Sequence, residues 1–175
     1  ERDFGFYLSE LNAEVTFTSF NQPKGFRLKN VILLTRLIRS LKPDVIHGHL
    51  GILSYLYFIK LFLLNSRIIY TIHNLAHKSC SNLLFKILNY AYFSSGMIRV
   101  ITISEECTQS YHRFYGLKNA NQILNGRLKV LPTKQYSSVE KEINGLKKSK
   151  EDLVFVHVAR YHEQKNQELL IRVFN

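Results

Sequence analysis

The sequence predicts an α/β fold, with a Rossmann-like parallel sheet that carries helices on both faces. Three observations lead to this prediction. Short apolar runs alternate with longer helical stretches, several of these runs are apolar throughout, and polar residues follow them directly. The chain has 175 residues, of which 46% are hydrophobic and 13% aromatic, so a disordered protein is excluded and a packed core is expected.

Six stretches are expected to form strands, because they are short and rich in β-branched or aromatic residues. They are residues 11–20, 44–49, 67–72, 99–103, 128–131 and 153–159. The last of them, LVFVHVA, is almost entirely apolar, which indicates a strand buried on both faces. Asn125–Gly126 is expected to form a turn just before residues 128–131.

Helices are expected at residues 31–41, 52–64, 82–93 and 167–174, and between caps at Ser104 and Gly116. In the first of these, four apolar residues recur at helical spacing and Pro43 stops the pattern. Ser104 suits an N-cap because two glutamates follow it in the first turn, where carboxylates complement the helix dipole. Gly116 suits a C-cap.

Two stretches need separate interpretation. Residues 50–64 are very apolar, but they contain Lys60 and are shorter than the about 20 residues that span a membrane, so a buried or interfacial helix is expected. Residues 133–152 are polar, charged and poor in large apolar side chains. They predict a connector with one solvated helix near residues 139–148.

The charge balance predicts an anionic partner. The chain has 24 Lys and Arg against 13 Asp and Glu, a net charge of +11, which suits nucleic acid, a membrane surface or a phosphorylated ligand. Two cysteines exclude a disulfide framework and a cysteine-based zinc site, and they favour a cytosolic protein. No signal peptide is visible, and an amino end without Met predicts a piece of a longer polypeptide.

Candidate site residues follow the expected strands, since ligands of open α/β sheets bind beyond the carboxyl ends of the strands. They are His47, Gly48 and His49, then His73 and Asn74, then Ser104 and Glu105, and finally residues 160–166. His47 and His49 share one face of a strand, but no carboxylate accompanies them, so we expect polar lining and no metal.

His73, Arg160 and Lys165 each allow two interpretations, one functional and one structural. His73 is placed to shuttle a proton or to contact a substrate hydroxyl, or else it is a structural histidine at a turn. Arg160 and Lys165 flank the start of a helix, where a diphosphate would be favoured; the alternative is two solvated cations. Asn125 and Gly126 are first of all turn residues.

Five segments together resemble a known family. LKPDVIHGHL, IIYTIHNL, VITISEEC, ILNG and VFVHVARYHEQKNQELLIRVF succeed one another between residues 41 and 174. Their order and spacing are similar to those of GT-B glycosyltransferases, most closely the family-four retaining enzymes of bacterial polysaccharide and glycolipid synthesis. The resemblance implies two Rossmann-like domains, with residues 1–131 on the acceptor side, a connector at 132–152 and the start of a nucleotide-sugar-binding domain at 153–175.

The resemblance also implies roles for the candidate residues. His73 matches the histidine at the reaction centre, and Arg160 and Lys165 match the basic pair that binds the donor diphosphate. The cleft is lined by residues with less defined roles, namely His47, His49, Asn74, Ser104, Asn125 and Gly126. The reaction implied is transfer of a sugar, with retention, from a nucleotide diphosphate sugar to a hydroxyl, with no cofactor or metal.

Two departures from the family pattern lead us to expect a central fragment with little activity by itself. The first strand with its glycine-rich loop is not found before residue 11, and the paired-glutamate motif is not found before residue 175. The expected partners are a nucleotide sugar, a glycan or lipid-linked acceptor and an anionic membrane surface, without nucleic acid. A cytoplasmic location, at the inner membrane face if the surface is used, follows from these partners.

A cluster of cations between residues 24 and 42 supports the membrane partner: Lys24, Arg27, Lys29, Arg36, Arg39 and Lys42. A solvated helix face explains the same cluster equally well. Three other functions stay open. They are a nucleotide-sugar 2-epimerase of the same architecture, a basic nucleic-acid-binding module, although no binding motif supports it, and a degenerate fragment without a function.

Overall fold

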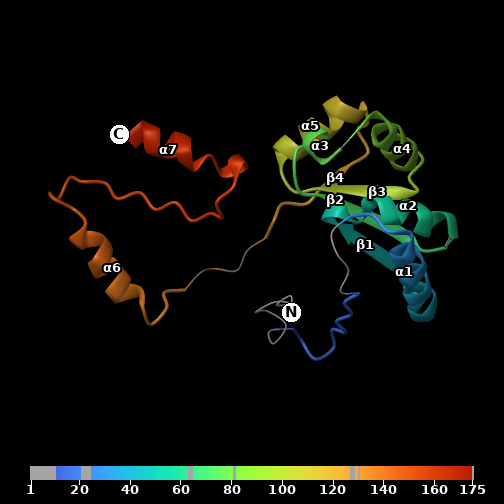
Figure 1. Ribbon diagram of the computed structural model, residues 1–175, viewed down its shortest axis with the longest axis horizontal. Helices are drawn as coiled ribbons and strands as arrows, with labels where there is room; N and C mark the ends of the chain where they lie inside the picture. The colour runs from blue at the N-terminus through green and yellow to red at the C-terminus, as the bar shows by residue number, and fades with distance from the viewer. Residues whose placement is uncertain are drawn as a thin grey trace. The chain divides into compact units, whose positions relative to one another are not determined.

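The computed structural model describes residues 11–20, 25–62, 65–80, 82–126, 129 and 131–174 (Figure 1). The chain forms two compact units, Glu1–Gly126 and Arg127–Asn175, which we call unit 1 and unit 2.

Unit 1 is built on a four-stranded sheet in which every neighbouring pair of strands is parallel. The strands follow the order of the chain and are β1 (Val45–His49), β2 (Arg67–Ile72), β3 (Ile98–Thr102) and β4 (Asn121–Gln122). Parallel neighbours need crossover connections, and helices supply them here. The predicted Rossmann-like α/β fold is thereby confirmed.

The helices of unit 1 connect or precede these strands. They are α1 (Leu28–Leu41), α2 (Leu53–Phe62) after the 3₁₀ turn η2 (Leu50–Ile52), the short α3 (Ala76–Ser79), α4 (Leu83–Ser94) and α5 (Glu105–Tyr115). Figure 1 shows α3, α4 and α5 grouped near β3 and β4, and α1 near α2. The predicted caps are confirmed, since Ser104 accepts a hydrogen bond from the Cys107 amide and Gly116 is left-handed with φ of 69°. The sequence did not predict α3.

The core of unit 1 lies between the sheet and its helices. Alternate residues of the strands are buried with large side chains of α2, α4 and α5: Leu56, Ile59, Ile68, Tyr70, Ile72, Phe93, Ile98, Val100 and Tyr111. Gly48 lets α2 approach β1, because a Cβ there would lie 2.6 Å from Leu56 Cδ1 and 2.9 Å from Ile52 Cγ2. The glycine between His47 and His49 therefore holds the end of β1 close under α2.

Two expected strands of the first 131 residues are corrected or left open. Residues 11–20, all described, form no strand, and Val15 and Phe17 are 53% and 52% exposed. Of residues 128–131, Leu128 and Val130 lie outside the described residues, and the strand that comes after α5 is β4. Ile123 N donates to Thr102 O, so the chain continues the ladder there, and Asn125–Gly126 forms no turn.

Unit 2 contains α6 (Tyr136–Gly145), a 3₁₀ turn η3 (Glu163–Lys165) and α7 (Gln167–Phe174). The solvated helix and the last helix of the sequence prediction are thus confirmed. Residues 153–159 are irregular, and Val158 is 91% exposed. A strand there was a wrong prediction, because no strand in the described part of unit 2 pairs with it. Packing inside the unit includes the rings of Phe155 and Phe174, whose centroids lie 4.7 Å apart.

Candidate functional site

The candidate site of unit 1 lies at the carboxyl ends of β1 and β2. The two strands are parallel, and their register pairs His47 with Ile69 and His49 with Thr71. Because side chains alternate along a strand, His47, His49 and Thr71 share one face of the sheet. His73 comes directly after β2. The topology therefore brings the predicted residues of two strands to one edge.

Three imidazoles meet at this edge, and we call them the histidine cluster: His47, His49 and His73. His49 Nδ1 lies 2.8 Å from His73 Nε2, and His47 Nε2 lies 2.7 Å from Thr71 Oγ1. The ring centroids of His47 and His49 are 4.2 Å apart, and those of His49 and His73 are 5.1 Å apart. The cluster is exposed to solvent, whereas Thr71 beneath it is buried.

One member of the cluster, His47, favours its neutral form. Partial burial, and then the charges of His49 and His73, lower the pKa of His47 below its ordinary value. Neutral rings offer both a donor nitrogen and an acceptor nitrogen, which suits the recognition of hydroxyl groups. Within the described part of the chain, no three His, Cys, Asp or Glu side chains are placed to hold a metal ion.

Asn74 and Ser104 follow β2 and β3 at the same edge of the sheet, and Ser104 caps the helix that comes next in the chain. Asn74 Oδ1 accepts a hydrogen bond from Leu75 N at 2.9 Å, next to the start of α3. Ser104 Oγ accepts one from Cys107 N at 3.2 Å, as the N-cap of α5. These contacts fix the loops after β2 and β3, although they do not by themselves assign a ligand to either residue.

A buried polar network near Ser104 was missed by sequence reasoning. Thr102 Oγ1 lies 2.6 Å from Thr108 Oγ1, which also lies 3.0 Å from Ser104 O and 3.1 Å from Gln122 Oε1. It ties the ends of β3 and β4 to the first turn of α5. Thr71, the partner of His47, was missed as well. A threonine among the last two residues of a strand was the available signal in both cases.

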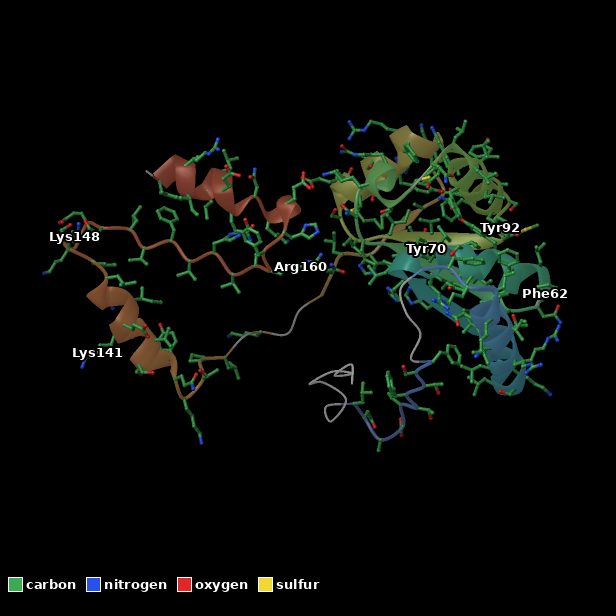
Figure 2. The ribbon with its side chains drawn as sticks, viewed as in Figure 1. Phe62, Tyr70, Tyr92, Lys141, Lys148 and Arg160 are labelled. Carbon is green, nitrogen blue, oxygen red and sulfur yellow. The ribbon has the colours of Figure 1, made fainter. Side chains whose placement is uncertain are left out.

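Arg160 and Lys165 lie in unit 2, on the turn that leads into α7. Arg160 O accepts a hydrogen bond from Gln167 Nε2 at 2.9 Å, which ties the stretch before η3 to the first residue of α7. Lys165 closes η3, and Asn166 comes next with a left-handed φ of 47°. Figure 2 shows Arg160 on the extended stretch before this turn. Arg160 therefore lies before η3 and Lys165 at its end, and we call this stretch the Arg160–Lys165 turn.

Asn125 and Gly126 stand apart from these groups. Both are exposed in the irregular stretch after β4, and Gly126 does not have a positive φ. The other predicted site residues fall into two groups, each of which lies within one unit. One is the histidine cluster of unit 1 with Asn74 and Ser104, and the other is the Arg160–Lys165 turn of unit 2.

Comparison with known proteins gives one match. The family model for Glycosyltransferase Family 4 matches residues 8–127, which is more than half of the chain. Comparison with curated proteins finds no match, and comparison with solved structures finds none either. The matched range contains all of β1 to β4 and the histidine cluster. The chain therefore belongs to glycosyltransferase family 4.

Proposed function

We propose that this chain belongs to a glycosyltransferase that moves a sugar, with retention, from a nucleotide diphosphate sugar to a hydroxyl of a glycan or lipid-linked acceptor. Family membership supports transfer between a sugar donor and an acceptor. The observation that carries the proposal is the histidine cluster at the carboxyl ends of β1 and β2, where α/β sheets bind their ligands.

The cluster is suited to sugar hydroxyls. A sugar presents several hydroxyl groups, each of which can donate and accept a hydrogen bond, and neutral imidazoles match both roles. His73 is the member beyond the strand end and is exposed, so a substrate can reach its ring. We assign it to the transferred sugar, and His47 and His49 to the lining.

The donor diphosphate is assigned to Arg160 and Lys165. Transfer breaks the bond between the anomeric carbon and a phosphate oxygen, and a new glycosidic bond forms to the acceptor oxygen. Negative charge then grows on the departing diphosphate. Two cations on a turn that leads into a helix amino end stabilise such charge through charge-assisted hydrogen bonds.

Removing either cation is expected to weaken donor binding. In Arg160→Ala and in Lys165→Ala, loss of one charge-assisted contact raises the dissociation constant by about 10- to 150-fold, which corresponds to about 1.5–3 kcal/mol. Calorimetric titration with UDP-glucose and GDP-mannose measures this on the full-length enzyme. Lys141→Ala, on the exposed face of α6, is the matched control and leaves binding unchanged (Figure 2). Unaltered affinity in both test variants would contradict the assignment.

We also propose that α1 contacts an anionic membrane surface. Lys29, Arg36 and Arg39 are exposed along one side of α1, together with Ile32, which is 53% exposed. Near the end of α1, a hollow of about 870 Å³ is lined by side chains that include Arg39, Lys42, Arg67 and Phe62. Phe62 is 56% exposed at the end of α2, at the edge of unit 1 (Figure 2). Lys24 lies outside the described residues.

This combination suits lipid headgroups. Cations attract anionic headgroups, and exposed apolar side chains such as Ile32 and Phe62 add contacts with the boundary of the acyl chains. The hollow lies at the amino ends of β1 and β2, since Val45 and Arg67 line it, whereas the histidine cluster lies at their carboxyl ends. Within the described residues, no helix is both long and apolar enough to cross a membrane.

The double variant Arg36→Gln plus Arg39→Gln is expected to weaken binding to phosphatidylserine vesicles. Each cation near such a surface contributes about 1 kcal/mol, so the loss is about 2 kcal/mol, or roughly thirtyfold in affinity. Co-sedimentation with vesicles measures the partition. Lys147→Gln plus Lys148→Gln in unit 2 removes the same charge and serves as the control. Lys148 is labelled in Figure 2. An equal loss of vesicle affinity in both double variants would show that only net charge matters. That result would contradict the proposal that α1 contacts the membrane.

A further inference from the structure

We propose that His49 is a positioning residue that fixes the tautomer of His73. In this arrangement His73 donates from Nε2–H to Nδ1 of His49, so that Nδ1 of His73 stays free as a hydrogen-bond acceptor for a substrate hydroxyl. The inference rests on the function proposed above, in which His73 faces the transferred sugar. It adds the direction of the hydrogen bond and the residue that sets this direction.

The contact between the two rings requires one proton between two nitrogens. His49 Nδ1 and His73 Nε2 are 2.8 Å apart, which is a hydrogen-bond distance. If His49 donated, both neutral rings would have to carry their proton on Nδ1. If His73 donates, both rings carry it on Nε2, the tautomer that a neutral histidine side chain ordinarily prefers. The second arrangement needs no unusual tautomer, and we adopt it.

His49 is itself held in place by the sheet. It ends β1 with extended backbone angles, φ −131° and ψ 152°, and its ring lies 4.2 Å from that of His47, centroid to centroid. His47 Nε2 is bonded to Thr71 Oγ1, and Thr71 is only 4% exposed. The series of side-chain contacts from Thr71 through His47 to His49 is therefore anchored in the sheet of unit 1.

His73 lacks such anchoring. It comes after the last residue of β2 and is exposed, and among the described residues its ring has a hydrogen bond only to His49. A ring with one hydrogen-bond partner takes its orientation and its tautomer from that partner. With Nε2 engaged, Nδ1 is the nitrogen left for a ligand, and in this tautomer it accepts a hydrogen bond.

Two nearly isosteric variants separate positioning from packing. In His49→Asn, the side-chain oxygen takes the place of Nδ1 and keeps the acceptor, whereas His49→Leu has a similar shape without an acceptor. The readout is the ¹⁵N spectrum of the His73 ring in the full chain, recorded at a pH where the imidazoles are neutral. Neutral Nδ1–H and Nε2–H tautomers give different nitrogen shifts, so the populations are measured without substrate.

The wild-type chain and His49→Asn are expected to keep His73 predominantly in the Nε2–H tautomer. In His49→Leu, the ratio of the tautomers shifts by about fivefold towards Nδ1–H, the change that corresponds to loss of one ordinary hydrogen bond. Thermal unfolding of the three proteins serves as the folding check. His77→Leu, which replaces an exposed histidine of α3, is expected to leave the spectrum of His73 unchanged.

Two results would overturn the proposal. One is a wild-type His73 that is predominantly Nδ1–H, and this result does not depend on any variant folding. The other is a folded His49→Leu in which the tautomer ratio of His73 equals that of the wild type. Neither measurement needs a donor, so a chain that binds no nucleotide sugar would count against the proposed function and leave the tautomer result intact.

Discussion

Unit 1 is expected to unfold cooperatively as the pH rises above about 10, because its core contains tyrosine hydroxyls that are buried and neutral. The four residues concerned are 0–7% exposed: Tyr57, Tyr70, Tyr111 and Tyr115. Burial disfavours the charged phenolate, and it raises the pKa of Tyr70 to about 12 and the pKa of the other three above the ordinary value as well.

In three of these residues, the hydrogen bond that the hydroxyl donates opposes ionisation too. Tyr57 donates to Asn89 Oδ1, and Tyr70 donates to the carbonyl of Leu50 at 2.6 Å. Tyr111 donates to Asn119 Oδ1 at 2.7 Å. Ionisation at any of these three positions would remove the proton that forms the hydrogen bond. It would also place a negative charge against a carbonyl oxygen. Asn89 cannot simply rotate its amide, because Asn89 Nδ2 donates to the hydroxyl of Tyr115 at 2.7 Å.

The sign of the effect follows from the direction of the pKa shifts. An unfolded tyrosine titrates near pH 10, whereas the buried ones titrate above it, so their contribution to stability is complete below about pH 10 and is lost at higher pH. In that interval, the contribution of each tyrosine to the free energy of unfolding falls by about 1.4 kcal/mol per pH unit. Four together lose about 5–6 kcal/mol in the first unit, as much as the whole stability of many domains.

Circular dichroism and the ultraviolet absorbance of tyrosinate, followed together against pH, measure this transition. Loss of helix signal and ionisation of the buried tyrosines are expected to coincide. Tyr136→Phe is the control, since Tyr136 lies on α6 in unit 2 and is 52% exposed. Complete ionisation of all tyrosines in a chain that keeps its helix signal would contradict the prediction.

The sheet of unit 1 could be predicted because its strands are marked locally. The predicted strand at residues 67–72 coincides with β2. The prediction at 44–49 begins one residue before β1, and the prediction at 99–103 is shifted by one residue from β3. Each lies between polar or turn residues and is succeeded by a helix with its own start and stop. Local sequence therefore decides both where each strand lies and where the next helix begins.

Residues 11–20 and 153–159 resemble the true strands in composition, yet they form no strand. Composition shows that a segment suits a sheet, but a strand also needs a neighbour to take up its backbone hydrogen bonds. Val15 and Val158 remain exposed in stretches that pair with no described strand. The presence of such a neighbour is a non-local property, which a pattern of ten residues does not contain.

The sequence indicated which residues lie at the edge of the sheet, but it did not indicate the contacts between their side chains. Strand ends indicated His47, His49 and His73, and the parallel pairing of β1 with β2 brings them together. The 2.8 Å contact between His49 and His73 depends on the strand register, as does the pairing of His47 with Thr71. Register is set by packing across the sheet, for example at Gly48 under α2. Arg160 and Lys165 stay predictions.

His73→Ala is expected to lower the turnover of sugar transfer by this protein by about 100-fold or more. The side chain contacts the transferred sugar in the proposed function, so its loss acts on the transition state at the anomeric carbon. Donor binding depends mainly on the diphosphate contacts of Arg160 and Lys165. The dissociation constant of the donor is therefore expected to change by less than about threefold, much less than turnover.

Initial rates with a radiolabelled nucleotide sugar give turnover, and calorimetric titration gives donor affinity in the same variant. His77→Ala is the control, because His77 is an exposed histidine on the neighbouring α3 and has no assigned contact to substrate. A fall in donor affinity as large as the fall in turnover would make His73 a ground-state binding residue, since uniform binding does not raise turnover. A decrease confined to turnover separates the two units by role, with the transferred sugar on the histidine cluster and the diphosphate on the Arg160–Lys165 turn.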